Sequence, residues 1–298
     1  MAAENAAKEL HMKIAGAPIS WGVCEVPGWG YQMSPERVLK EMKEIGLTAT
    51  EFGPQGWLPV EPEARAAAVA KFGLKPVGSF FLAVMHDPDF DPIPMVEAEL
   101  KAFEVAGGEV LVLAADSGQE GYDARPVLDE QGWQTLFTNL SRISDVCRAK
   151  GVTAVLHPHW GTMVQNVDEV ERVLDNSTVG LCLDTGHLTC GGADVVELVR
   201  KYADRVGIVH AKDVRLDLAK KLLPGEINWS EGIKAGMFVP IGQGDVDFAT
   251  IARLLDEAGF DGYWVLEQDI MIDEEPPADG GPVSNAAASF EALKALAS

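Results

Sequence analysis

The segment VTAVLHPHWGTMVQNVDEVERVLDNSTVGLCLD, residues 152–184, decides the fold. It begins with a β-branched and apolar run at 152–157 and passes through a polar loop into a stretch of helical period near 167–175. It ends in a second apolar run at 179–184. A strand, an amphipathic helix and another strand in this order are typical of a parallel βαβ unit. This unit predicts an α/β protein built on a parallel sheet.

The same alternation extends in both directions along the chain. The predicted strands cover 14–20, 47–52, 75–81, 109–114, 152–157, 179–184, 205–210 and 262–267. The predicted helices lie near 35–45, 61–72, 93–106, 133–150, 167–175, 193–202, 247–258 and 286–297. Eight such pairs predict a single (β/α)₈ TIM barrel over residues 13–298, after a flexible N-terminal segment at 1–12. An open doubly wound sheet is the alternative, but no GxGxxG motif follows the first predicted strand.

The segment 211–246, which follows the seventh predicted strand, is much longer than the other loops. Long loops at the carboxyl end of barrel strands often cover an active site. Trp229 and Phe238 are the aromatic residues with which this segment could do so. A surface elaboration or a subunit contact is an equally good interpretation.

Composition narrows the class of protein and of partner. The chain has 298 residues, of which 47% are hydrophobic and 23% charged, so collagen-like, disordered and disulfide-stapled folds are excluded. Its net charge of −22 disfavours nucleic acid and anionic membranes as partners. The cysteines lack CxxC spacing and are typical of reduced thiols: Cys24, Cys147, Cys182 and Cys190. With no signal-peptide core at the N-terminus and no apolar run of about 18 residues, we expect a cytoplasmic protein.

Four metal-ligand side chains stand at the ends of four consecutive predicted strands: His157, Asp184, His210 and Glu267. In a closed barrel these strand ends are neighbours, and their side chains enter one cup. A set of two imidazoles and two carboxylates suits Mn²⁺, Co²⁺, Fe²⁺ or Zn²⁺ better than Ca²⁺. The sequence therefore predicts one divalent cation bound by these four residues. Mn²⁺ or Co²⁺ is preferred, with Fe²⁺, Mg²⁺ and Zn²⁺ as alternatives.

Further polar and aromatic residues flank the same strand ends. We expect these to contact the substrate: Trp21, Glu51, His159, His187, Lys212 and Arg215. Each could instead be a loop residue or a partner that orients a ligand. Asp213 and Thr185 are assigned to such structural roles.

Several motifs carry a resemblance to a known family. They are PISWG, TATEFGP, LHPHWGT, GLCLDTGHL, VHAKDVR, MFVPIGQGDVDF and WVLEQD, spread over residues 18–269. The chain resembles the xylose-isomerase-like TIM-barrel superfamily of sugar isomerases and epimerases, and within it the inosose dehydratase branch. The superfamily's metal set of Glu, Asp, His and Glu corresponds to His157, Asp184, His210 and Glu267. The first position departs from this pattern, because His157 stands where the epimerases have a glutamate. Epimerases of this type use two glutamates, one to remove a proton and one to return it, so the departure puts that mechanism in doubt here.

The resemblance implies a metal-dependent carbon–oxygen lyase, a dehydratase acting on a polyhydroxylated ketone such as 2-keto-myo-inositol or a related keto-sugar. Removal of an α-proton would be followed by β-elimination through a metal-stabilised enediolate. The expected catalytic residues are Glu267, His159, Lys212 and His187; the division of acid and base among them stays open. A keto-sugar epimerase or isomerase is the principal alternative. Elimination from a 3-keto-glycoside, a metal-dependent endonuclease and a non-catalytic sugar-binding barrel are others. Barrels of this type often form homo-oligomers, as we expect here.

Overall fold

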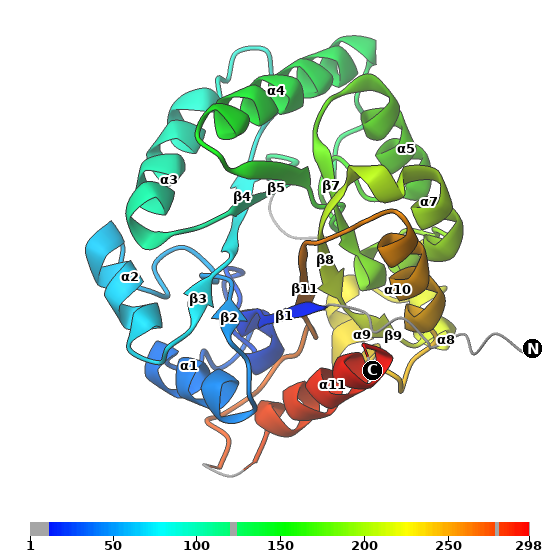
Figure 1. The fold of residues 1–298 in the computed structure, drawn as a ribbon. Coiled ribbons are helices and arrows are strands. Elements are labelled where there is room, and N and C mark those ends of the chain that lie inside the picture. The colour runs from blue at the N-terminus through cyan, green and yellow to red at the C-terminus, as the bar shows by residue number, and fades with distance from the viewer. Residues whose placement is uncertain (1–11, 120–123, 278–279, 298) are drawn as a thin grey trace, which may run out of the picture.

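The protein is a parallel barrel ringed by helices, shown in a computed structural model that describes residues 12–119, 124–277 and 280–297 (Figure 1). Residues 1–11 of the predicted flexible segment lie outside the described residues. The strands of the main sheet are β1 (Lys13–Gly16), β2 (Ala49–Thr50), β3 (Lys75–Pro76), β4 (Gly78–Ala83), β5 (Val110–Ala115), β6 (Thr153–Leu156), β7 (Gly180–Asp184), β8 (Val206–Ala211) and β11 (Tyr263–Leu266). All eight predicted strands are present, as the TIM-barrel prediction requires.

The barrel closes at Val77. This residue separates β3 from β4, the two end elements in the hydrogen-bonding order of the sheet. Its N–H donates to the carbonyl of Thr50 at 2.9 Å, and its own carbonyl accepts from Val110 N–H at 3.0 Å. β3 and β4 therefore act as one bent strand, which gives eight strand positions around the barrel.

An outer ring of helices alternates with the strands. It comprises α1 (Pro35–Glu44), α2 (Pro62–Ala70), α3 (Ile93–Ala106), α4 (Glu130–Ala149), α5 (Val167–Asn176), α7 (Val195–Tyr202), α10 (Phe248–Glu257) and α11 (Pro282–Leu296). Local sequence begins several of them: Ser34 caps α1 ahead of Pro35, and Asn166 with Glu169 forms a capping box on α5. None of the described helices is long and apolar enough to cross a membrane.

Two apolar layers hold the barrel together. The larger one fills the space between the strands and the outer helices. The smaller one lies inside the barrel and is made mainly of small and β-branched side chains: Ala15, Ala49, Val77, Val112, Val155, Cys182, Ile208 and Val265. Because successive side chains alternate across a strand, the same strands supply both layers.

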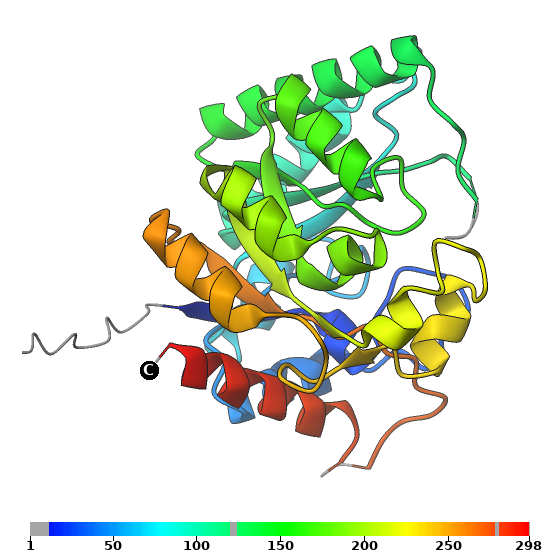
Figure 2. The same cartoon turned by 90° about the vertical axis from the view of Figure 1, so that its right-hand side faces the viewer.

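The structure corrects two predicted boundaries. The first predicted strand, 14–20, ends at Gly16, and Pro18–Trp21 forms a 3₁₀ helix. The segment 211–246 contains the short helices α8 (Leu216–Ala219) and α9 (Trp229–Lys234) and an antiparallel pair of β9 (Asp213–Val214) with β10 (Phe238–Val239). Figure 2 shows α8 and α9, in yellow, grouped together beside the barrel. A further short helix, α6 (Thr185–Cys190), and the 3₁₀ turn Ala203–Arg205 were not predicted.

Candidate active site

The four predicted metal ligands meet at the carboxyl end of the barrel. Asp184 is the last residue of β7, His210 lies near the end of β8, and His157 and Glu267 directly follow β6 and β11. His157, Asp184 and His210 are buried, and the side chain of Glu267 is 8% exposed. His157 Nε2 lies 3.1 Å from Asp184 Oδ2, and His210 Nδ1 lies 3.2 Å from Glu267 Oε1 and 3.8 Å from Asp184 Oδ2. The structure thus joins the four side chains through a chain of close pairs.

Their arrangement fits a divalent cation. His210 Nε2 faces Glu51 Oε1 at 3.0 Å, and because a carboxylate only accepts, Nε2 carries the proton. Burial acts to lower the pKa of His210, but Cys182, Glu267 and Glu51 raise it well above its ordinary value, so Nδ1 is protonated as well, and a bound cation would replace that proton. Ligand atoms that share one cation at about 2.1 Å lie about 3.0–3.4 Å apart. Glu267 Oε1 is at this separation from Nδ1, at 3.2 Å, and Asp184 Oδ2 is somewhat farther away, at 3.8 Å. A carboxylate that holds the other nitrogen of a ligating histidine is a common feature of such sites.

Lys212 supplies a buried positive charge beside these carboxylates. Its Nζ lies 3.2 Å from Asp184 Oδ2, 3.0 Å from Glu267 Oε2 and 2.8 Å from Asp269 Oδ1. Burial acts to lower the pKa of Lys212, but the three carboxylates raise it well above its ordinary value. Burial acts to raise the pKa of Asp184, but Lys212 and the neighbouring histidines hold it below its ordinary value. The ammonium and the carboxylates of Asp184 and Glu267 are therefore charged.

Asp269 is a site residue that the sequence analysis missed. It lines the pocket, and burial raises its pKa to about 6 against the opposing effect of Lys212. Its Oδ2 also lies 3.7 Å from His187 Nε2. The available signal was spacing: Asp269 stands two residues beyond Glu267, just as Lys212 stands two residues beyond His210. Residues two apart at a strand end share a face of the sheet.

The backbone of Trp160 fixes the tautomers of two neighbouring histidines. Its carbonyl lies 2.8 Å from His159 Nδ1, so this nitrogen carries the proton and Nε2 the lone pair. Its N–H donates to His187 Nδ1 at 3.2 Å, so the neutral His187 ring carries its proton on Nε2. The two rings are in contact, with centroids 4.0 Å apart and planes tilted by 34°. His159 is thus set up to accept a proton and His187 to donate a hydrogen bond.

Burial keeps both of these imidazoles neutral. It lowers the pKa of His159 to about 3, and it lowers that of His187 well below its ordinary value. His159 lines the pocket, whereas His187 lies behind it against the indole of Trp229. A neutral imidazole at neutral pH has the charge state that general base catalysis requires.

The segment 211–246 covers this part of the site. The Trp229 ring stacks on His187 with centroids 4.9 Å apart and on Trp160 with centroids 5.6 Å apart. Phe238 packs edge-on against Trp229, and Lys212 Nζ lies 5.4 Å from the Phe238 ring centroid. These contacts favour the lid interpretation of the segment. The pocket beneath is lined mainly by Ala17, Pro18, Ile19, Trp29, Glu51, Phe80, His157, His159, Lys212, Trp229, Glu267 and Asp269.

Two predicted substrate contacts lie elsewhere. Trp21 is fully buried in the layer outside the barrel, where its indole N–H donates to Glu41 Oε2 at 2.7 Å. The 3₁₀ turn that follows β1 redirects its side chain, so Trp29 and Trp229 supply the aromatic pocket wall instead. Arg215 is 44% exposed and pairs with Asp217 at 3.1 Å, because β9 carries the chain away from the pocket after Lys212.

The two residues predicted to be structural have that role. Asp213 accepts hydrogen bonds from the backbone N–H groups of Gly242, Gly244 and Val246, which ties the end of the long segment to β9. The Thr185 hydroxyl donates to the carbonyl of Lys212 at 2.7 Å and accepts from its N–H at 3.0 Å. Both residues hold Lys212 and its surroundings in place.

Comparisons with known proteins agree with this architecture. A family model described as a xylose isomerase-like TIM barrel matches residues 27–296. The inosose dehydratase of Geobacillus kaustophilus (strain HTA426) is 31% identical over 302 residues, and the match covers 95% of this chain and 94% of that protein.

Solved structures of low sequence identity share the fold. The IOLI protein with a bound zinc atom superimposes with a TM-score of 0.68 at 15% identity, over 96% of this chain and 98% of that one. A probable 3-DHS dehydratase, AsbF of Bacillus anthracis, gives a TM-score of 0.66 at 15% identity, over 95% and 98% of the two chains.

Proposed function

The chain belongs to the xylose isomerase-like TIM barrel family, and from this premise we propose that it is a metal-dependent dehydratase of a polyhydroxylated ketone. The relative from Geobacillus kaustophilus named inosose dehydratase supports 2-keto-myo-inositol as the substrate to test. A divalent cation held by His157, Asp184, His210 and Glu267 would polarise the carbonyl of this ketone as a Lewis acid. Mn²⁺ or Co²⁺ suits this mixed nitrogen and oxygen set.

His159 is the proposed base. Its Nε2 has the lone pair because the carbonyl of Trp160 holds the proton on Nδ1, and its pKa of about 3 keeps the ring neutral. It removes the proton from the carbon next to the carbonyl. The negative charge that then develops on the carbonyl oxygen is stabilised by the ammonium of Lys212, the one buried lysine among the described residues.

The proton for the leaving hydroxyl comes from the Asp269 carboxyl, whose pKa of about 6 leaves part of it protonated near neutral pH, and the proton taken up by His159 restores it through water after the elimination. His187 carries its proton on Nε2, 3.7 Å from Asp269 Oδ2, and Asp269 lines the pocket. The carbon–hydrogen and carbon–oxygen bonds break, one carbon–carbon double bond forms, and the hydroxyl leaves as water.

The close contact of the His159 and His187 rings, with centroids 4.0 Å apart and planes tilted by 34°, is the observation that carries this proposal. It puts the proposed base beside the pair of His187 and Asp269 on one side of the pocket, so that the base and the proton source would act on the same face of the substrate. Inversion at a single carbon by an epimerase needs two groups on opposite faces. The geometry therefore favours elimination over epimerisation.

Proton NMR of 2-keto-myo-inositol in D₂O tests the function. We expect loss of water to give a dione with the Mn²⁺-loaded protein, and no reaction after the metal is removed or in Asp184→Asn. The cation is chelated before the spectra are recorded, because it is paramagnetic. Deuterium uptake at the α-carbon without loss of oxygen would overturn the dehydratase proposal and support an epimerase.

A further inference from the structure

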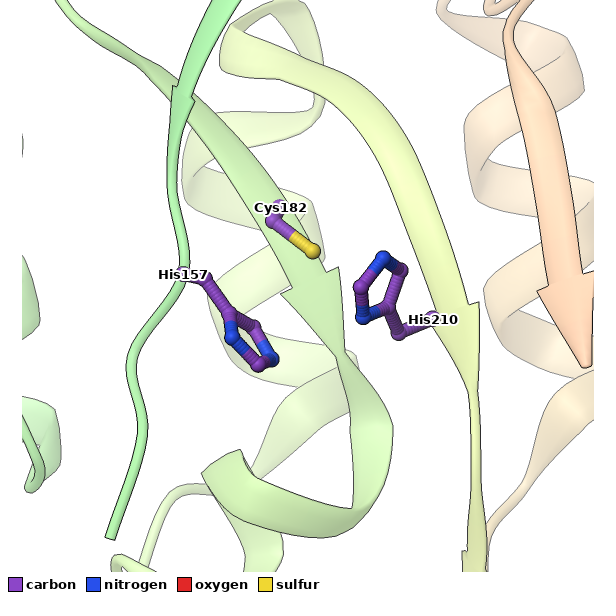
Figure 3. Close-up of side chains that lie close together, drawn as sticks. All are labelled: His157, Cys182 and His210. Carbon is purple, nitrogen blue, oxygen red and sulfur yellow. The ribbon is translucent and has the colours of Figure 1, made fainter. Parts of the chain in front are cut away.

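A thiol lies between two imidazoles in the interior of the barrel. Cys182 is on β7, between β6 and β8, and His157 and His210 come from the ends of those two flanking strands. One ring nitrogen of each histidine and the sulfur of Cys182 lie within 4.8 Å of one another. Figure 3 shows the three side chains converging from neighbouring strands.

The surroundings of this cluster point to more than packing. A buried cysteine is usually a small apolar side chain, and Cys182 does pack among the valines and alanines inside the barrel. The facing His210, however, is only 1% exposed, and its Nδ1 makes no well-aligned hydrogen bond within the described ranges, although Glu267 Oε1 lies 3.2 Å away. His157 Nδ1 is also buried without one. A nitrogen without a hydrogen bond at this depth is costly, and a bound cation would satisfy it.

We propose that His157, Cys182 and His210 form a second cation site, for a thiophilic ion such as Zn²⁺ or Cd²⁺. Thiolate and imidazole are the ligands such ions prefer, whereas Mn²⁺ prefers carboxylate. Bond lengths of about 2.3 Å to sulfur and 2.0–2.1 Å to nitrogen place the ligand atoms of a trigonal site about 3.6–3.8 Å apart. Small side-chain shifts from separations within 4.8 Å reach this geometry. One cation binds and the thiol proton leaves to solvent.

This site and the proposed catalytic site exclude one another. Both use His157 and His210, so a cation on the Cys182 side withdraws these imidazoles from the side of Asp184 and Glu267. Lys212 then remains paired with those carboxylates, as it is in the structure. A thiophilic ion should therefore inhibit the protein. The binding site itself stands on the geometry alone, and only this inhibition rests on the proposed function.

Titration of the metal-free protein with Cd²⁺ tests the binding site. We expect an ultraviolet sulfur-to-cadmium charge-transfer band that saturates at one equivalent. The band should be lost in Cys182→Ser and in Cys182→Ala, the second variant serving if the first does not fold. Cys147→Ser and Cys190→Ser are matched controls, because both thiols are buried elsewhere, and each should keep the band. A band that persists in both Cys182 variants, or no band in the parent protein, would overturn the proposal.

A second measurement tests the mutual exclusion. Mn²⁺ binding followed by electron paramagnetic resonance should be unchanged within twofold in Cys182→Ser. Cd²⁺ should displace Mn²⁺ from the parent protein at a concentration at least tenfold lower than from this variant. Equal displacement from both would refute the shared ligands. Failure of the Mn²⁺-loaded protein to dehydrate 2-keto-myo-inositol would count against the proposed function alone, because the cadmium band does not depend on it.

Discussion

Replacement of Lys212 by Met removes the charge on which three buried carboxylates depend. The side chain is 1% exposed, and its Nζ lies within 3.2 Å of an oxygen of Asp184, Glu267 and Asp269. Breaking a buried ion pair by removal of one partner costs about 3–5 kcal/mol. At about 2.1 cal/mol/K per residue, the unfolding entropy of 298 residues is about 0.6 kcal/mol/K. The metal-free variant should therefore melt about 5–8 °C lower than the parent protein.

The same substitution should have the opposite effect on metal binding. The ammonium contacts Asp184 and Glu267, so it repels a cation that uses these ligands. Lys212→Met should bind Mn²⁺ at least about tenfold more tightly, which corresponds to about 1.4 kcal/mol of added stabilisation. Turnover should nevertheless fall by about 10²–10³, because the charge that stabilises the developing oxyanion is gone.

Thermal unfolding with and without Mn²⁺, isothermal titration with Mn²⁺ and turnover together test this reasoning. Lys71→Met is the control: Lys71 is 57% exposed, pairs with Glu36 at the surface, and should change stability by less than about 1 kcal/mol. A variant of Lys212 that loses the same stability with and without Mn²⁺, or that binds Mn²⁺ more weakly, would refute the electrostatic account.

Three further substitutions test other parts of the site. The pKa of His159 falls from 6.5 to about 3 on folding, so the unfolded chain binds the proton first and stability declines as the pH falls from about 6.5 towards 3. Protonation of this group alone should lower the free energy of unfolding by about 2 kcal/mol at pH 5 relative to pH 8. Urea unfolding of His159→Gln should lack that part of the decline. Parallel curves of stability against pH for the two proteins would contradict this expectation. In Gly186→Ala, the new Cβ would lie 2.7 Å from Cγ and Cδ of Lys212. Replacement of Gly by Ala ordinarily stabilises a helix, but here the clash should lower the free energy of unfolding by about 1–3 kcal/mol. Because the clash displaces Lys212, kcat should fall as well. Gly232→Ala, where the nearest atom is the flexible end of Met237 at 3.2 Å, is the control, and equal effects on kcat would dismiss the contact with Lys212. Trp229→Ala should destabilise the protein by about 3–5 kcal/mol and lower kcat/KM, because the ring packs on both His187 and Trp160. Trp229→Phe should recover part of both losses. An unchanged kcat/KM in Trp229→Ala would show that the segment 211–246 does not act as a lid.

The barrel could be predicted because its signals are local. Each strand is a short apolar run and each outer helix an amphipathic stretch with its own capping residues, such as Ser34 and Asn166. The count of eight such pairs then leaves few topologies. The meeting of His157, Asp184, His210 and Glu267 follows from the same count, because parallel strands in a barrel end at one rim.

Prediction failed where the chain turns after a strand. Trp21 and Arg215 both follow predicted strand ends closely, yet a 3₁₀ turn puts the first into the outer core and β9 carries the second to the surface. The fold of such turns depends on contacts with distant segments. The indole of Trp21, for example, finds its hydrogen-bond partner in Glu41, twenty residues along the chain.

By itself, the sequence determined the barrel, its rim of ligand-type side chains and the acidic surface of the protein, because alternation, spacing and charge are properties of the chain. Tertiary structure alone decided which groups are charged and which nitrogen of each imidazole carries a proton. Those depend on burial and on partners brought in from other strands, such as Glu51 on His210 and the Trp160 peptide between His159 and His187. The chemistry of the site is therefore set by contacts between residues far apart in the sequence, whose energies exist only after the barrel has closed.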